Sequence, residues 1–238
     1  MSKDKKKQLI DMFNNHSYTL GVREAFNVFI AYSASRLNLA YLTNGDEARV
    51  KMLNNMIKSS DYTKEELSTM FNLMVDSLEE NLEQDLLGEI FTELNLTNAK
   101  SGQFFTPYTI SKFMAEMNLN EISTQRDTPI TIADPCCGTG GMLIAAGNVI
   151  KDKKLKPEKF IFYAQDIDWT VAMAAFIQLS LHGLPGMVVI GNSLDPSTSP
   201  PSLQDKDNCW ITSPTYIYHP QLFEQLDKQV RQVKKTKK

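Results

Sequence analysis

The sequence predicts an α/β protein with an N-terminal helical domain over residues 1–100 and an α/β domain over residues 101–238. Two observations carry this prediction. Residues 1–100 contain no proline, and their apolar side chains recur at helical spacing. From residue 101 onward, short apolar runs alternate with helical stretches, which is the spacing of βαβ units in a parallel sheet.

About four helices fit the N-terminal domain. Residues 44–46, Asn-Gly-Asp, indicate a turn in which Asp46 is a candidate N-cap for the following helix. Residues 61–63 indicate another helix start, because Glu65 and Glu66 occupy the first turn after them. The methionines and aromatic residues of this domain are expected to form its core.

Four strands and three helices are expected in the second domain. The strands cover residues 130–133, 160–164, 187–190 and 209–212, and the helices cover residues 140–150, 169–181 and 221–235. The helix at 169–181 is apolar nearly all round, so we expect it to be buried against the sheet.

A polar residue follows each of the four predicted strands. These residues are Asp134, Asp166, Asn192 and Ser213. The carboxyl ends of parallel strands meet at one edge of a sheet, where ligands bind in such folds. The sequence therefore predicts that the four residues share one layer at a ligand site.

The loop Gly138-Thr139-Gly140-Gly141 lies between the first strand and its helix. Glycines at this place allow close backbone approach, and the helix start offers free N–H groups. No lysine follows as in a phosphate-binding P-loop, and Leu143 occupies the third glycine position of a dinucleotide fingerprint. The remaining class is a cofactor whose amino and carboxylate groups lie over the loop.

S-adenosylmethionine is such a cofactor. Asp134 would face its ammonium group, and Asp166 would take both ribose hydroxyls. The alternative is a glycine-rich turn that only packs a helix on a strand. No metal site is expected, because Cys136 and Cys137 do not form a CxxC pair and the histidines lack ligand spacing with the cysteines.

Several motifs together resemble the N6-adenine DNA methyltransferases, specifically the modification subunit of type I restriction-modification systems. In chain order they are Asp85-Leu86-Leu87-Gly88, Gly102-Gln103-Phe104-Phe105-Thr106-Pro107, the run from Asp134-Pro135 to Gly138-Thr139-Gly140-Gly141, Gln165-Asp166-Ile167-Asp168 and Gly191-Asn192-Ser193-Leu194. The resemblance covers roughly residues 80–216. It implies a partial Rossmann-like, S-adenosylmethionine-dependent methyltransferase domain.

The resemblance also implies which residues bind the cofactor. From the methionine end to the adenine ring they are Phe105, Thr106, Pro107, Asp134, Gly138, Gly140, Asp166 and Asn192. Asp166 would bind the ribose, and Asn192 would lie near the adenine ring.

The catalytic motif departs from the family. After the fourth strand the family carries Asn-Pro-Pro followed by Tyr or Phe, which holds the amino group of a flipped base for attack on the methyl group. Here residues 213–216 are Ser-Pro-Thr-Tyr. The catalytic candidates that the resemblance implies are Ser213, Pro214 and Tyr216. Serine at the first position of this motif also occurs in some amino-methyltransferases that act on cytosine. Thr215 replaces a proline that helps set the loop.

The implied partners are DNA, reached through a specificity subunit or another protein, and a second copy of the chain is an alternative. A complete methyltransferase sheet has more strands than four, so an open sheet edge is expected beside the fourth strand.

The net charge is −3, and the basic residues from position 228 onward form either a solvated helix end or a weak phosphate contact. No apolar run is long enough to cross a membrane, and no signal peptide begins the chain, so a cytoplasmic protein is expected.

Three functions remain open at this stage. The first is a subunit of an adenine-N6 DNA methyltransferase that needs a partner for DNA recognition. The second is a catalytically impaired relative that binds S-adenosylmethionine and acts as a regulator or decoy of restriction. The third is a helical interaction module with a vestigial sheet.

Overall fold

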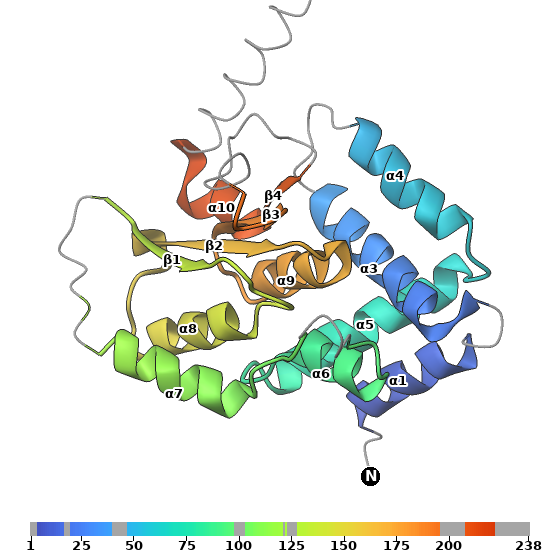
Figure 1. Ribbon diagram of the computed structural model, residues 1–238, viewed down its shortest axis with the longest axis horizontal. Coiled ribbons are helices and arrows are strands. Elements are labelled where there is room, and N and C mark those ends of the chain that lie inside the picture. Colours follow the sequence, from blue (N-terminus) through green and yellow to red (C-terminus); the bar gives the residue numbers. More distant parts are fainter. Residues whose placement is uncertain are drawn as a thin grey trace, which may run out of the picture.

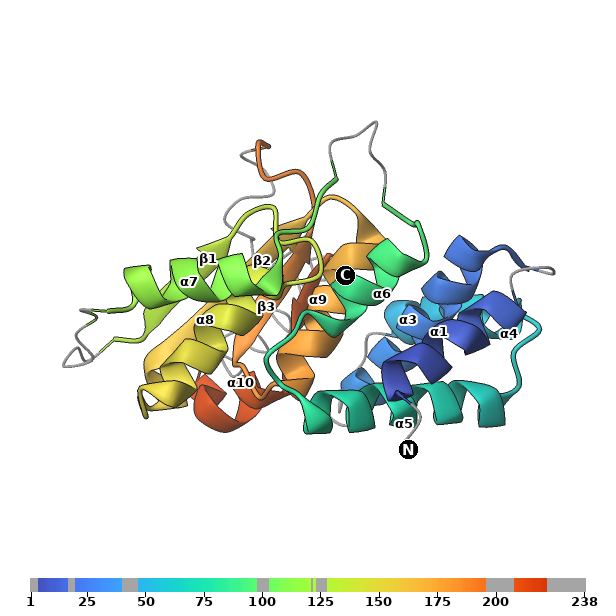
Figure 2. The same ribbon diagram turned by 90° about the horizontal axis from the view of Figure 1, so that it is seen from below.

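The computed structural model describes residues 4–16, 20–39, 47–97, 103–120, 122, 128–195 and 208–221. Its N-terminal part is helical and its C-terminal part is an α/β layer structure, as Figures 1 and 2 show. The predicted α/β fold class with a helical N-terminal part is therefore confirmed. None of the described helices is long and apolar enough to cross a membrane.

The described residues before position 98 form five helices. They are α1 (Lys5–Asn15), α3 (Val22–Leu39), α4 (Glu47–Lys58), α5 (Lys64–Glu80) and α6 (Leu86–Glu93). The helix start expected near residue 63 is confirmed, because Thr63 caps α5 in a capping box with Glu66. The Glu66 amide donates to Thr63 Oγ1 at 3.2 Å, and the Thr63 amide donates to Glu66 Oε2 at 2.8 Å. Asp46 lies outside the described residues.

The α/β part alternates helices and strands along the chain. Its elements are α7 (Tyr108–Asn118), β1 (Ile130–Asp134), α8 (Gly141–Asp152), the 3-10 turn η2 (Pro157–Lys159), β2 (Phe160–Asp166), α9 (Trp169–Leu181), β3 (Gly186–Ile190), β4 (Cys209–Ile211) and α10 (Ser213–Tyr218). The expected helix over residues 221–235 lies almost entirely outside the described residues.

The sheet has the order β1-β2-β3-β4. Strands β1, β2 and β3 are parallel, and α8 and α9 lie on one face of them (Figures 1 and 2). Helix α9 packs against β2 and β3 on one side and against α3 on the other. Eleven of its thirteen residues are buried, so the prediction of a buried helix is confirmed. One continuous hydrophobic core joins the helical and the α/β parts.

The expectation of a fully parallel sheet is wrong at β4. This strand pairs with β3 in the antiparallel sense, with Ile211 beside Met187 and Cys209 beside Val189. The carboxyl end of β4 therefore lies beside the start of β3. It is at the opposite end of the strands from the carboxyl ends of β1, β2 and β3. The other outer strand is β1, so β4 and β1 form the two edges of the described sheet.

Candidate cofactor site

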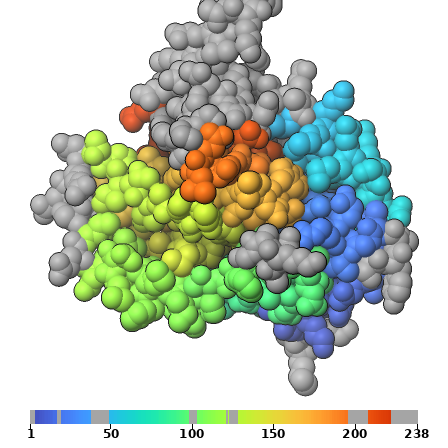
Figure 3. Space-filling model, in the orientation of Figure 1, coloured from blue at the N-terminus to red at the C-terminus, as the bar shows by residue number. Residues whose placement is uncertain are grey.

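A cavity of about 420 Å³ lies where the segments after β1 and β2 meet α3, α6 and the chain before α7. Figure 3 shows the segments that follow β1, β2 and β3 close together on one face of the molecule. The volume is in the range of about 300–1,000 Å³ that is usual for small-molecule sites. Five predicted cofactor residues line the cavity: Phe105, Thr106, Asp134, Gly138 and Asp166.

The glycine loop is held against the end of β2. The Gly138 amide donates to Asp166 Oδ2 at 2.9 Å, and the Cys137 amide donates to the Gln165 carbonyl at 2.9 Å. Gly138 has φ +53°, a conformation that side-chain-bearing residues rarely adopt. A Cβ at this position would lie 2.7 Å from Cε1 of Phe105. Glycine at position 138 therefore permits both the turn and the close approach of the aromatic ring.

Three predicted cofactor residues lie outside the cavity wall. Gly140 caps α8 with φ +91°, and a Cβ there would lie 3.2 Å from Cβ of Ala175, so this glycine packs α8 against α9. Pro107 is the N-cap of α7. Asn192 lies in the segment after β3, which approaches the glycine loop where Ser193 Oγ lies 3.6 Å from Cys136 Sγ.

The two carboxylates that follow β1 and β2 face the same cavity. Burial raises the pKa of Asp134, and the negative charge of Asp166 raises it further, although the Cys136 amide donates to Asp134 Oδ1 at 3.1 Å. Asp166 also accepts the Asp168 amide at 3.0 Å, so its oxygens are oriented by two backbone amides. Each oxygen retains a lone pair, because a carboxylate offers about four acceptor sites.

Other cavity residues were given no cofactor role by the sequence analysis. Arg23 of α3, Asp85 at the start of α6, and Asp168 at the start of α9 all line the wall. Arg23 lies over the Phe91 ring, 5.6 Å from its centroid. No sequence signal separates Arg23 from the other basic residues of the helical part. Asp85 belongs to a motif on which the resemblance rests, but nothing in the motif indicated that its side chain is buried.

The described residues contain no group of three or more histidine, cysteine or acidic side chains able to hold a metal ion. Cys137 is buried in the loop, and burial raises the pKa of its thiol well above the usual value. A neutral thiol in this place acts as a small packing group.

The residues expected to act on the target base lie elsewhere. Ser213 begins α10 beyond the carboxyl end of β4, and its hydroxyl donates to the Leu37 carbonyl at 3.4 Å. Pro214 and Thr215 are buried there. The prediction that Ser213 shares a layer with Asp134, Asp166 and Asn192 is therefore wrong, because β4 runs in the opposite direction. Ser213, Pro214 and Tyr216 are likewise absent from the cavity wall.

The fold and the cavity define an α/β protein with a cavity at the carboxyl ends of its parallel strands. The family model described as N-6 DNA Methylase matches residues 82–226, and the chain belongs to this family. S-adenosylmethionine is the cofactor that membership of this family implies.

Two curated relatives are methylase subunits of type I restriction enzymes. The EcoEI methylase subunit of Escherichia coli is 30% identical over 106 residues, which are 41% of this chain and 20% of that protein. The MpnII methylase subunit of Mycoplasma pneumoniae (strain ATCC 29342 / M129 / Subtype 1) is 25% identical over 142 residues, which are 58% of this chain and 25% of that protein. The chain thus spans a quarter or less of the length of these relatives.

A solved structure is also similar. It is described as a putative class I S-adenosylmethionine-dependent methyltransferase from Listeria monocytogenes. The two chains are 15% identical with a TM-score of 0.44, over 82% of this chain and 55% of that one.

Proposed function

We propose that this chain is the cofactor-binding part of an adenine-N6 DNA methyltransferase of the restriction-modification type. The single observation that carries the proposal is the convergence of the glycine loop, Asp134 and Asp166 on one cavity. Family membership adds the identity of the cofactor.

The volume of the cavity and the charge of its wall fit S-adenosylmethionine. Four carboxylate side chains and one guanidinium line the wall: Asp85, Asp134, Asp166, Asp168 and Arg23. An acidic wall favours a ligand that carries a sulfonium and an ammonium. Asp134 would face the ammonium, the amides at the start of α8 would meet the carboxylate, and Asp166 would accept the ribose hydroxyls. Bound there, the cofactor supplies an electrophilic methyl group.

The motif-like residues that would hold the target base do not lie next to this cavity. Ser213, Pro214 and Tyr216 stand at the far edge of the sheet, so their assignment as catalytic residues depends on a rearrangement of β4. An acidic cavity wall also disfavours contact with DNA phosphates. We therefore infer that DNA recognition and base binding come from another polypeptide segment, such as a specificity subunit.

Calorimetry with S-adenosylmethionine, followed by tritiated methyl transfer to unmethylated genomic DNA, tests the proposal. We expect micromolar cofactor binding and no turnover by the pure chain at enzyme-stoichiometric concentration. Absence of binding at millimolar cofactor would contradict cofactor binding and favour the interaction module. Robust turnover by the pure chain would contradict the need for a partner.

A second candidate is a regulator or decoy that binds the cofactor without transferring its methyl group. The antiparallel placement of β4 favours it, because it removes the motif-like residues from the cofactor. Co-expression with a candidate specificity subunit separates the two functions. Methyl transfer by the complex supports the methyltransferase, whereas continued cofactor binding without transfer supports the regulator.

A further inference from the structure

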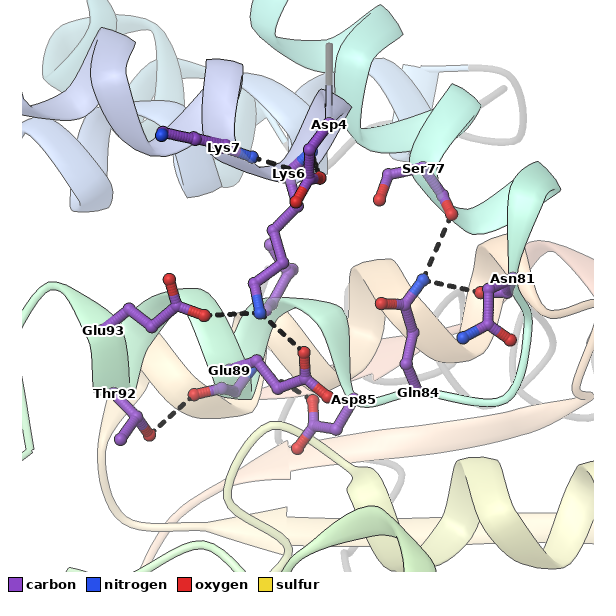
Figure 4. A network of polar contacts seen from close by, with 12 residues as sticks. Asp4, Lys6, Lys7, Ser77, Asn81, Gln84, Asp85, Glu89, Thr92 and Glu93 are labelled. Carbon is purple, nitrogen blue, oxygen red and sulfur yellow. Dashed lines mark hydrogen bonds and ion pairs between the residues drawn. The ribbon is translucent and has the colours of Figure 1, made fainter. Parts of the chain in front are cut away.

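Asp85 is a buried carboxylate to which the proposed function gives no specific role beyond its charge. It is 6% exposed and caps the start of α6, where its Oδ1 accepts the Gly88 amide at 3.0 Å. Figure 4 shows it at the start of α6, while Glu89 and Glu93 of the same helix meet Lys6 of α1. Asp85 therefore stands at the junction of the helical and α/β parts.

The Asp85 carboxylate joins three separate segments. Besides Gly88, it accepts the side-chain amide of Gln178 in α9 at 2.7 Å and the hydroxyl of Thr139 in the glycine loop at 2.6 Å. Gln178 also donates to the Thr139 carbonyl at 2.8 Å, and its own oxygen accepts the Leu87 amide at 3.1 Å. Thr139 is thus held at both its hydroxyl and its carbonyl.

Close packing makes this junction intolerant of movement. A Cβ at Gly88 would lie 2.3 Å from Asp85 Oδ2 and 2.5 Å from Thr139 Oγ1. A Cβ at Gly141, the first residue of α8, would lie 2.8 Å from the same Asp85 oxygen. Helices α6 and α8 therefore begin against one carboxylate, and glycine at both positions makes room for it.

The loop that this junction holds has a conformation that needs external support. Gly138 and Gly140 on either side of Thr139 have φ +53° and +91°. Gly138, Gly141 and Asp85 all line the cavity. Thr139 itself is fully buried and does not line the cavity, so its hydrogen bonds support the loop from within the protein.

We propose that Asp85 is a positioning residue that acts through Thr139 to hold the glycine loop in the shape that binds the amino-acid end of S-adenosylmethionine. The proposal rests on the proposed function. It assigns the helical part a task in cofactor binding, since Asp85 belongs to α6 and the loop belongs to the α/β part.

Selective loss of the amino-acid contacts is the expected signature. The ligands are S-adenosylmethionine and 5′-methylthioadenosine, which keeps the adenine and ribose, has a neutral thioether in place of the sulfonium, and lacks the amino-acid end. Thr139→Val should lower the affinity for S-adenosylmethionine about tenfold, which is the loss expected for a hydrogen bond to a charged group. It should lower the affinity for 5′-methylthioadenosine less, because that ligand lacks the amino-acid end that lies over the loop. Thr139→Ser, which keeps the hydroxyl, should retain wild-type affinity for both.

A double-mutant cycle tests whether Asp85 acts through Thr139. Asp85→Ala removes the oxygen that accepts the Thr139 hydroxyl and should lower the affinity for S-adenosylmethionine selectively. Adding Thr139→Val to it should lower the affinity no further than Asp85→Ala alone, because the hydrogen bond between the two side chains is already absent. Thr69→Val is the matched control, since its exposed hydroxyl donates to the Glu65 carbonyl within α5, far from the glycine loop in the chain.

Three outcomes would overturn the inference. They are unchanged S-adenosylmethionine affinity in Thr139→Val, equal weakening of the two ligands, and additive effects in the cycle. Thermal unfolding of every variant accompanies the titrations, and equal weakening together with a lowered melting temperature assigns Asp85 a structural role alone. If the wild type binds neither ligand, the proposed function itself fails and the inference falls with it.

Discussion

The end of β2 and the end of β4 look alike in the sequence but differ in the structure. Each is an apolar run followed by a polar residue, Asp166 in one case and Ser213 in the other. The segment after β2 joins the glycine loop at a cavity, whereas the segment after β4 starts a short helix at the opposite end of the strands, with Pro214 and Thr215 buried. The comparison teaches that a strand-end pattern locates a ligand site only when the direction of the strand is known.

The hydrogen bonds of the two segments show the same contrast. Asp166 accepts two loop amides and faces a cavity, so its interactions orient it toward a ligand. Thr212 and Thr215 are fully buried, and both hydroxyls accept the Gly186 amide, at 2.9 and 2.7 Å. The threonines satisfy the backbone at the start of β3, which is a structural task.

The largest expected effect is on stability, at the end of β4. Thr215→Pro, the change that would restore the family motif, removes a buried hydroxyl and the amide that donates to the Thr212 carbonyl at 3.0 Å. We expect the free energy of unfolding to fall by about 3 kcal/mol. Urea unfolding measures the loss. Methyl transfer should stay absent in Thr215→Pro combined with Ser213→Asn, and recovery of transfer would show that this segment is catalytic.

A slightly smaller effect, on cofactor affinity, is expected in the glycine loop. Gly138→Ala adds a Cβ where φ is +53° and the Phe105 ring lies 2.7 Å away. Backbone strain and displacement of the ring should lower the affinity for S-adenosylmethionine about 100-fold, as measured by calorimetry.

Gly183→Ala is the matched control for this prediction. Gly183 has φ +71°, but no atom lies within 4 Å of the added Cβ. It should lower stability by about 1 kcal/mol and leave cofactor affinity unchanged. Equal loss of affinity in both variants would mean that strain anywhere, and not the shape of the loop, weakens binding.

A pH dependence of cofactor binding is the third prediction. The pKa of Asp134 is raised by burial and by Asp166, so the unbound protein gains stability as the pH falls through that raised value toward the usual one. A cationic ligand prefers the ionised carboxylate, so its affinity should fall in the same window. We expect the affinity to fall several-fold as the pH is lowered from neutrality toward the usual pKa of an aspartate, about 3.9.

Calorimetry across this range, with Asp134→Asn as comparison, checks the sign. The variant should bind more weakly at high pH and lose the part of the pH dependence that Asp134 contributes. An unchanged pH slope in Asp134→Asn would assign the titration to another group.

The smallest effect is expected where α1 meets α6. Lys6 lies 2.8 Å from Glu89 and 2.5 Å from Glu93, with both partners half exposed (Figure 4). Lys6→Met should lower the free energy of unfolding by about 0.5 kcal/mol, because solvent screens exposed ion pairs. Cofactor affinity should not change. A loss of affinity would show that the packing of α6 against α1, and not only Asp85, controls the glycine loop.

The sequence by itself determined the helical N-terminal part, the four strands, helices α8 and α9, and the first half of the site, whereas α7 and α10 were not predicted. The capping box at Thr63, the apolar helix at α9 and the glycine loop are local patterns, and local patterns reflect interactions between residues close in the chain. The motifs around Asp134 and Asp166 follow parallel strands, so their shared edge also followed from the sequence.

Only the tertiary structure decided the direction of β4 and the surroundings of Asp85. A three-residue strand carries no local signal for parallel or antiparallel pairing, and its partner is chosen by packing and by the backbone groups at the start of β3. Asp85 lies 54 positions from Thr139 and 93 from Gln178, so no local pattern reports the contacts of its carboxylate. Contacts between distant segments form only when the core brings them together, and these contacts hold Thr139 in the glycine loop.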